Sequence, residues 1–517
     1  MTNHPSNLPG PGSNVKGRAA GAAWTYLLDE LTAERVVCIG EPTSASRVTL
    51  ERIADRLTVI PAVGRWDRGG LPATPDTKGE EADLVYLVNP TMDGIEEAMR
   101  QLAPRGLLYL ETSAGKAERT VRGRVAELGG LVRDRYLLSP TSGEARTAVP
   151  AADRGILRFF VERDLIVFGL HPLVRPLERR LALRKPSRGR VGLMVARRPD
   201  PDGPGVPRYL VRLAGQQGLD LSSYRYGLSA RGQYNSRKVV FFLFPPGRTT
   251  PTVVVKTTRD ATFNDRLVSE EAALQQLASR HLVPRGTVPE VAFSGEHGGL
   301  RILAETVVDG TSMRNAGAPV ESAYRWLTDL AVDSAERGAT AAASIEARLA
   351  TLAADVPARY PLTEVEAEAI RALVDEVRGH SSRIPTVLSH GDAATWNAVR
   401  MADGRIGFLD WEAGHADGIP LWDLWYFARS HVMSASRVRR RLGFRGPDVL
   451  TALRRDAALS AAVKDYTARL EIPAEVVKPL FALCWADRAL REVTRIDEGR
   501  LAHGHYVNLL RRLLAAT

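Results

Sequence analysis

The sequence predicts two folded parts of different class: an α/β domain of Rossmann-like type over residues 23–199, and an α+β domain with two lobes over residues 209–310 and 311–517. Three observations predict this division. A chain of 517 residues is too long for one ordinary domain. Strand-like and helical stretches alternate in the first part. Prolines and glycines are dense across residues 197–207, which places a linker at about 200–208.

The net charge of the chain is only weak evidence about its binding partners. The net charge is +10, but arginine is spread along the whole chain. Two basic runs, 175–190 and 437–445, are expected to be solvated faces or linkers. Neither interleaves aromatic residues as a single-strand binding surface would, so we do not expect nucleic acid as a partner.

The composition also predicts a soluble, cytoplasmic location. Residues 1–22 are rich in Pro, Gly, Ser and Asn and have no hydrophobic signal segment, so they are expected to form a disordered tail. The apolar runs are strand-sized, well below the roughly 20 residues of a membrane-spanning helix. Cys38 and Cys484 lie in different halves and are expected to be buried and unpaired.

The first part is predicted to alternate strands and helices. The expected strands are 35–40, 57–60, 82–88 and 106–111, and the expected helices are 46–56 and 93–102. This order predicts a mostly parallel sheet. Two later runs, 156–162 and 191–196, are expected to finish the sheet as an antiparallel edge.

This order resembles the class I methyltransferase fold, and residues 95–111 resemble the segment before that family's fifth strand. The resemblance implies S-adenosylmethionine as a cofactor. The cofactor motifs depart from the family: the loop after the first strand, residues 40–44, has one glycine and a proline. The second strand ends without an acidic residue. A degenerate scaffold domain therefore stands as the alternative.

After the linker, the pattern predicts a glycine-containing hairpin and a third strand that ends in lysine. Residues 226–236 form the predicted turn region, followed by strands at 239–244 and 252–256. A glycine-rich turn lets backbone amides approach phosphate oxygens, and a strand lysine can pair with phosphates. Gly232, Asn235 and Lys256 are therefore the candidate nucleotide contacts.

A helix is predicted over residues 264–280, with Leu267, Leu274 and Leu277 on one face. Glu270 lies on this helix and could hold Lys256 toward a nucleotide, as a helix glutamate does in kinases. A surface carboxylate is the alternative for a lone glutamate.

The decisive segment is 386–397, which carries Asp392 and Asn397 five residues apart, followed by Asp410 after a second short strand. Phosphoryl transfer needs one carboxylate to orient the attacking hydroxyl and accept its proton. It also needs oxygen ligands for the metal ions that neutralise the phosphates. We therefore expect Asp392 as the base and Asn397 and Asp410 as metal ligands.

These residues resemble the aminoglycoside phosphotransferase and choline kinase-like family, whose signature is H-G-D-x-x-x-x-N followed by D-W-E or D-F-E. Residues 418–424 resemble the family's G-D-P-x-x-D-L element, although Ile419 replaces its first acid. The resemblance implies a two-lobed protein-kinase-like fold, ATP and Mg²⁺ as cofactors, and transfer to a hydroxyl of a small molecule or biosynthetic intermediate. It gives Asp423 a supporting role.

Several alternatives remain open from the residues alone. His390 is expected to be structural, because no second His or Cys lies at ligand spacing. The aromatic group Trp411, Trp422, Trp425 and Tyr426 is expected to pack a core, with a cation-binding box as the alternative. The basic stretch 437–441 points toward an anionic or neutral acceptor. A bifunctional methyl- and phosphotransferase and a non-catalytic nucleotide-binding regulator are the competing functions.

Overall fold

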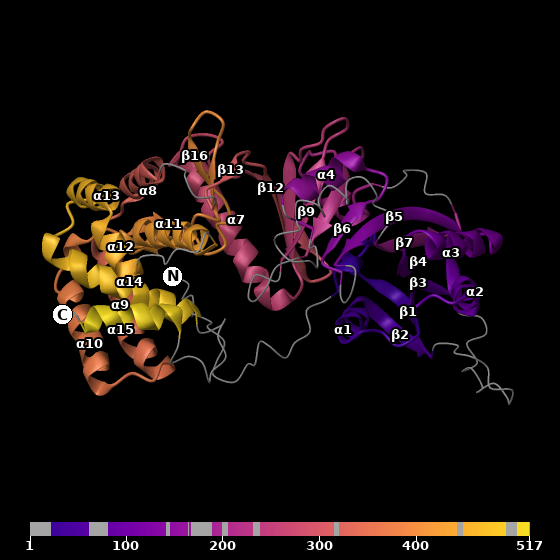
Figure 1. Ribbon diagram of the computed structural model, residues 1–517, viewed down its shortest axis with the longest axis horizontal. Helices are drawn as coiled ribbons and strands as arrows, with labels where there is room; N and C mark the ends of the chain where they lie inside the picture. The colour runs from indigo at the N-terminus through magenta and orange to yellow at the C-terminus, as the bar shows by residue number, and fades with distance from the viewer. Residues whose placement is uncertain are drawn as a thin grey trace. The chain divides into compact units, whose positions relative to one another are not determined.

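The computed structural model describes residues 22–61, 81–140, 145–163, 165–166, 189–198, 205–230, 238–314, 320–441, 448–492 and 504–515 (Figure 1). The chain forms two compact units. The first takes the residues up to Asn264 together with Ala292–Glu305, and the second takes Asp265–Val291 and the residues from Thr306 onward. The boundaries that the sequence places at 200–208 and 310 stay predictions.

A large mixed sheet forms the first unit, in the order β11-β12-β10-β9-β8-β6-β5-β7-β4-β3-β1-β2. Its strands are β1 (Ala33–Ile39), β2 (Ala54–Ile60), β3 (Ala82–Leu87), β4 (Leu102–Ser113), β5 (Leu131–Ser139), β6 (Thr147–Pro150), β7 (Arg190–Ala196), β8 (Arg225–Ser229), β9 (Lys238–Phe244), β10 (Val253–Thr258), β11 (Val291–His297) and β12 (Leu300–Thr306).

Four neighbouring strands, β2-β1-β3-β4, run parallel, as the alternating pattern predicts. Strand β7 lies antiparallel between β4 and β5, so it is an interior strand and not the expected edge. The helices of this unit are α1 (Ser44–Ile53), α2 (Met92–Gln101), α3 (Lys116–Glu127), α4 (Arg154–Glu162) and α6 (Arg208–Gly215), with 3-10 turns η1 (Ala23–Leu27) and η4 (Ala261–Phe263). Apolar side chains of α2 and α3 enter one core and those of α1 another, because the strand side chains alternate between the two faces.

The sheet continues without a break from the N-terminal strands into the predicted phosphate-binding hairpin. Strand β6 pairs antiparallel with β8, and β8, β9 and β10 follow as antiparallel neighbours. Three antiparallel strands are thus confirmed in this region. The third extends two residues beyond Lys256, which lies opposite Val240.

The prediction of a strand at residues 156–162 is wrong, because this segment belongs to helix α4. The side chain of Asp153 accepts a hydrogen bond from the Ile156 backbone N–H and caps the helix. Ile156, Leu157, Phe160 and Val161 are buried, a spacing that fits one face of a helix. A short run rich in apolar residues does not distinguish a buried helix from a strand by periodicity alone.

Three stacked aromatic rings occupy the first unit beside α1. The Trp24 ring lies 4.6 Å from the Tyr86 ring and 4.8 Å from the Tyr109 ring, nearly parallel to both. The Trp24 indole N–H donates to Ser46 Oγ at 3.5 Å, and Ser46 Oγ lies 3.2 Å from the Tyr86 hydroxyl. All three rings are buried, so they hold η1 against β3 and β4, which carry Tyr86 and Tyr109.

Helices make up most of the second unit. They are α7 (Asn264–Ser279), α8 (Glu321–Ser334), α9 (Ala339–Arg359), α10 (Glu364–Arg378), α11 (Trp422–Arg441), α12 (Val449–Arg455), α13 (Ala457–Arg469), α14 (Val477–Glu492) and α15 (His505–Leu514), with η5 (Ser381–Arg383) and η6 (Ala474–Val476). Asn264, the first residue of α7, still belongs to the first unit. Five short strands complete the second unit: β13 (Thr311–Ser312), β14 (Val387–Ser389), β15 (Ala398–Arg400), β16 (Ile406–Phe408) and β17 (His415–Gly418). This confirms the predicted helices across 322–352 and, in the described parts of 448–514, those at 449–455, 457–469, 477–492 and 505–514.

Both cysteines are buried and free, as expected. Burial raises the pKa of the Cys38 thiol to about 11, so it stays protonated at neutral pH. Within the described ranges, no helix is long and apolar enough to cross a membrane.

The aromatic stack predicts a large stability effect at Trp24. Replacing Trp24 with Ala should lower the free energy of unfolding of the first unit by about 3–5 kcal/mol, because a buried indole is lost and a cavity remains. Urea denaturation followed by circular dichroism measures this change. Val59→Ala is the control, since Val59 is 40% exposed and should change stability by less than about 0.5 kcal/mol. A loss below about 1 kcal/mol for Trp24→Ala would contradict the role of the stack.

Candidate active site

The candidate catalytic loop follows β14 and lies entirely in the second unit. Strand β14 is buried along its whole length and pairs antiparallel with β17. The loop then carries His390, Gly391 and Asp392, and β15 begins directly after Asn397. A buried strand on each side fixes where the loop starts and where it ends.

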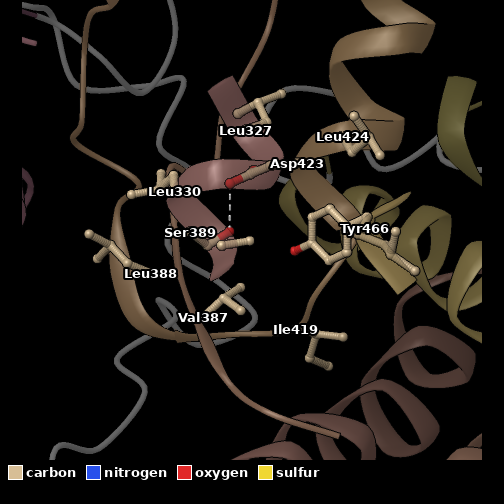
Figure 2. A pocket seen from close by; sticks show the side chains of 11 residues that line it. Leu327, Leu330, Val387, Leu388, Ser389, Ile419, Asp423, Leu424 and Tyr466 are labelled. Atoms are coloured by element: carbon tan, nitrogen blue, oxygen red, sulfur yellow. Dashed lines mark hydrogen bonds between the residues drawn. The ribbon is translucent and has the colours of Figure 1, made fainter. Parts of the chain in front are cut away.

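Asp423 holds the start of this loop. The Ser389 hydroxyl donates to Asp423 Oδ2 at 2.8 Å, as Figure 2 shows, and the His390 backbone N–H donates to the same oxygen at 2.6 Å. The Gly391 N–H donates to Oδ1 at 3.1 Å. A carboxylate that accepts three hydrogen bonds from consecutive residues fixes their conformation. The predicted supporting role of Asp423 is confirmed.

Gly391 is required by the shape of the loop. Its φ angle is +73°, in the left-handed region. A Cβ atom at this position would come within 2.0 Å of the Ala413 carbonyl oxygen. Both the backbone conformation and the close approach therefore exclude a side chain here.

His390 is a structural residue, as predicted. Its ring is fully buried and packs 4.5 Å from the Trp411 ring. The Asp392 backbone N–H donates to Nδ1 at 3.2 Å, so Nε2 is the nitrogen that donates to the Leu409 carbonyl at 3.0 Å. The histidine thereby ties the residue before Asp410 to the backbone of Asp392.

Asp392 and Asn397 are brought together, as the five-residue spacing predicts. The Asn397 side-chain Nδ2 donates to Asp392 Oδ2 and to the Asp392 carbonyl, both at 3.0 Å. Asn397 is buried, whereas the Asp392 side chain is 24% exposed. The Leu409 N–H donates to the Asn397 carbonyl at 2.8 Å, which links this pair to the segment that carries Asp410.

Asp410 follows β16 in an unusual backbone conformation. Its φ angle is +67°, a left-handed value that Asp tolerates better than most residues. Phe408 and Trp411 on either side of it are fully buried. These anchors fix the backbone on both sides of the half-buried Asp410.

Glu270 is fully buried on α7, so it is not a surface carboxylate. Its Oε1 accepts a hydrogen bond from the Trp411 backbone N–H at 2.9 Å. Glu270 therefore helps to hold the residue next to Asp410. Lys256 belongs to the first unit, where its Nζ lies 2.5 Å from Glu305 Oε1 and both side chains are buried. The pairing of Lys256 with Glu270 stays a prediction.

Some predicted features lie outside the described residues. They are Gly232 and Asn235 in residues 231–237, most of the basic run 175–190, and the side chains of the basic run 437–445.

The sequence interpretation missed Arg488 and Arg491 on α14. Arg488 NH1 lies 3.8 Å from Asp392 Oδ1, and Arg491 NH1 donates to the Gly391 carbonyl at 2.9 Å. Arg491 Nε pairs with Asp487 at 2.9 Å, and Arg348 pairs with the same carboxylate. Burial opposes ionisation of Asp487, but its arginine neighbours hold its pKa well below the usual range. The available signal was the group of Asp487, Arg488 and Arg491 directly after the apolar stretch 479–486.

The aromatic group packs a core, as predicted. Trp411, Trp422, Trp425 and Tyr426 are all buried in the main cluster of the second unit. The Trp422 indole N–H donates to the Leu480 carbonyl at 3.1 Å. By contrast, Trp396 in the catalytic loop is 39% exposed.

A small cavity lies behind the catalytic loop, lined mainly by apolar side chains such as Leu330, Ile419 and Tyr466 (Figure 2). Its volume of about 10 Å³ is about enough for one water molecule. Ser389 and Asp423 also line it, so it belongs to the support of the loop and is too small for an acceptor.

The Asp423 geometry predicts a stability effect that does not depend on any substrate. Asp423→Asn should lower the free energy of unfolding of the second unit by about 2–3 kcal/mol, because charge-assisted hydrogen bonds to buried groups are lost. Urea denaturation measures it, with Asp465→Asn as the control, because the Asp465 side chain on α13 is exposed. Equal unfolding midpoints for the two variants would show that Asp423 does not hold the loop.

The model of the phosphotransferase enzyme family matches residues 231–459. No curated protein matches significantly. Similar solved structures include the aminoglycoside phosphotransferase APH(3'')-Id from Streptomyces rimosus ATCC10970, with 16% identity, coverage of 55% of this chain and 97% of that chain, and a TM-score of 0.34. Another is the choline kinase LicA from Streptococcus pneumoniae, with 12% identity, coverage of 55% and 92%, and a TM-score of 0.35. Residues 231–459, less than half of the chain, thus match the model of the phosphotransferase enzyme family, and this match supports a phosphotransferase that acts on hydroxyl groups.

Proposed function

We propose that the protein transfers the γ-phosphoryl group of ATP, in the presence of Mg²⁺, to a hydroxyl of a small molecule or biosynthetic intermediate. The observation that carries this proposal is the fixed pair of Asp392 and Asn397, joined by hydrogen bonds of 3.0 Å in a loop held by Asp423. Phosphoryl transfer depends on positioned charge more than on covalent help from the protein, and this loop supplies positioned charge.

Asp392 is the proposed general base. Its carboxylate is partly exposed, so an acceptor hydroxyl can reach it. The carboxylate orients the hydroxyl and accepts its proton while the hydroxyl oxygen attacks the γ-phosphorus. The bond from the γ-phosphorus to the bridging oxygen breaks, and ADP leaves with that electron pair.

Asn397 and Asp410 are the proposed metal ligands, and their chemistry fits Mg²⁺. Both contacts of Asn397 to Asp392 use Nδ2, so its amide oxygen Oδ1 is the atom that can serve as a ligand. In the described part of the chain, no group of three or more His, Cys, Asp or Glu residues suits a metal ion. Phosphate oxygens and water would complete the octahedral shell that Mg²⁺ prefers. When bound, the ion neutralises charge on the phosphates.

Lys256 is the proposed partner of the α and β phosphates. Its salt bridge to the buried Glu305 fixes the position of the ammonium group on β10. Gly232 and Asn235 are proposed to contact the phosphates from the preceding turn, and Glu270 is proposed to hold Lys256, as the sequence predicts.

Methyl transfer receives no support from the first unit. In open parallel sheets, ligands bind outside the carboxyl ends of the strands. Trp24 packs there, against Ser46 at the start of α1 and Tyr86 near the end of β3. The Thr43 side chain, rather than a ligand, accepts the Ser46 N–H at the start of α1. None of these contacts among the described residues is specific to S-adenosylmethionine, so we assign no methyl-transfer step to the protein.

Replacing Asp392 tests the proposed base. Asp392→Asn should lower kcat for phosphorylation at least 1,000-fold, because the proton acceptor is lost, while the Kd for ATP changes by less than about threefold. Product formation is followed by ADP release and nucleotide binding by calorimetry. Asp403→Asn, in an exposed turn, is the matched control. Retention of more than a tenth of wild-type kcat would rule out Asp392 as the base.

The metal assignment has its own test. Asp410→Asn should raise the Mg²⁺ concentration needed for half-maximal activity at least tenfold, because one anionic ligand is lost. A Mg²⁺ titration of ADP formation at saturating ATP measures this, with Asp465→Asn as the control. An unchanged Mg²⁺ requirement would remove Asp410 from the metal site.

A further inference from the structure

Arg488 stands next to the catalytic aspartate with unused hydrogen-bonding capacity. Its NH1 and NH2 lie 3.8 Å from Asp392 Oδ1 and 3.9 Å from Asp423 Oδ1. Both distances are too long for hydrogen bonds. Among the described residues, no acceptor receives a hydrogen bond from Arg488. Its guanidinium carbon lies 3.5 Å from the centre of the Tyr426 ring, which fixes its position.

A second arginine, Arg429 on α11, is also buried and has no carboxylate partner in the described part of the chain. Arg429 is 5% exposed, and its Nε has no hydrogen-bond partner. Its NH1 donates to the Tyr506 hydroxyl at 3.3 Å, and its guanidinium carbon lies 4.4 Å from the Tyr506 ring centre. A buried guanidinium without a counter-ion is costly, so this site is suited to an anion.

The two arginines are connected through their tyrosines. The Tyr506 hydroxyl donates to the Tyr426 hydroxyl at 3.4 Å, so Arg429, Tyr506, Tyr426 and Arg488 form one chain of contacts that ends at Asp392. Helices α11, α14 and α15 supply these residues and pack together in the second unit (Figure 1). We call these four residues the arginine–tyrosine cluster.

Two further side chains, His505 and Trp396, affect which ligand the cluster suits. Burial and the charge of Arg429 lower the pKa of His505 to about 4, so His505 is uncharged at neutral pH and adds no competing positive charge. The exposed Trp396 of the catalytic loop lies edge-on to Tyr426, with ring centres 6.2 Å apart. An exposed ring beside the proposed base offers a surface on which the body of an acceptor can pack.

We propose that the acceptor carries an anionic group, a phosphate or a carboxylate, which Arg429 and Arg488 bind while its hydroxyl lies at Asp392. This inference rests on the proposed function and names its substrate class. Arginine presents paired N–H donors that match both anions. A cationic acceptor is disfavoured, because two guanidinium groups would repel it. Each tyrosine also already carries a guanidinium against its ring.

The test uses the full-length protein, Mg²⁺, ATP labelled with ³²P at the γ position, and a cellular small-molecule extract split on an anion-exchange resin. Label incorporated into compounds of the retained, anionic fraction supports the proposal. Incorporation only in the unretained neutral and cationic fraction overturns it. The absence of labelled product from either fraction instead contradicts the proposed function itself, so the two failures can be told apart.

A second experiment distinguishes a phosphate from a carboxylate as the anionic group of the acceptor. The retained fraction is treated with a phosphatase, which is then removed before the labelling reaction. Loss of acceptor activity identifies a phosphate group, whereas retained activity identifies a carboxylate.

Variants connect the result to the cluster. Arg429→Met should raise the KM for the anionic acceptor at least tenfold with kcat changed less than threefold, and Arg429→Lys should recover part of the loss. Arg378→Met, in an exposed pair on α10, is the matched control. Thermal unfolding followed by circular dichroism establishes that each variant is folded. Equal KM values for wild type and a folded Arg429→Met would overturn the assignment of Arg429.

Discussion

The second unit depends on one carboxylate. Asp423, in the first turn of α11, accepts hydrogen bonds from Ser389, His390 and Gly391 in succession. The loop cannot shift without breaking charge-assisted bonds, some to buried groups. The His390 ring donates a hydrogen bond to the Leu409 carbonyl, and the Leu409 N–H donates to the Asn397 carbonyl. Leu409 is therefore fixed relative to both His390 and Asn397. The position of Asp392 relative to Asp410 follows from these contacts.

Two groups can be distinguished among four arginines of the second unit, Arg348, Arg491, Arg488 and Arg429. Asp487 is neutralised by Arg348 and Arg491, and Arg491 also donates to the Gly391 carbonyl. Arg348 and Arg491 are therefore both paired with a carboxylate of the protein itself. Arg488 and Arg429 are held mainly by aromatic rings and keep donors that no described residue satisfies. A guanidinium held by a ring is fixed in place and can still bind an anion, which is why these two arginines point to a ligand and the others do not.

Much of the catalytic loop could be predicted from the sequence, because the Asp392 to Asn397 spacing and the flanking apolar runs are local features. The parallel strands β1 to β4 were predictable for the same reason. The helix at 154–162 was not predicted, because its composition is typical of a strand although Asp153 caps it and its buried residues have helical spacing. Arg488 and Arg429 were also missed. They lie 96 and 37 residues after Asp392, and it is the packing of α14 that brings Arg488 to the loop. The buried role of Glu270 toward Trp411 likewise depends on tertiary contact.

The central claim is that Asp392 acts on the hydroxyl while Asn397 and Asp410 hold the metal. A crystal structure of the full chain with Mg²⁺ and a non-hydrolysable ATP analogue tests this division most directly. We predict that Mg²⁺ binds to the Asn397 amide oxygen and the Asp410 carboxylate, and that Asp392 lies outside the metal shell and faces the γ-phosphate. Metal bound directly by Asp392, or a nucleotide bound away from this loop, would contradict it.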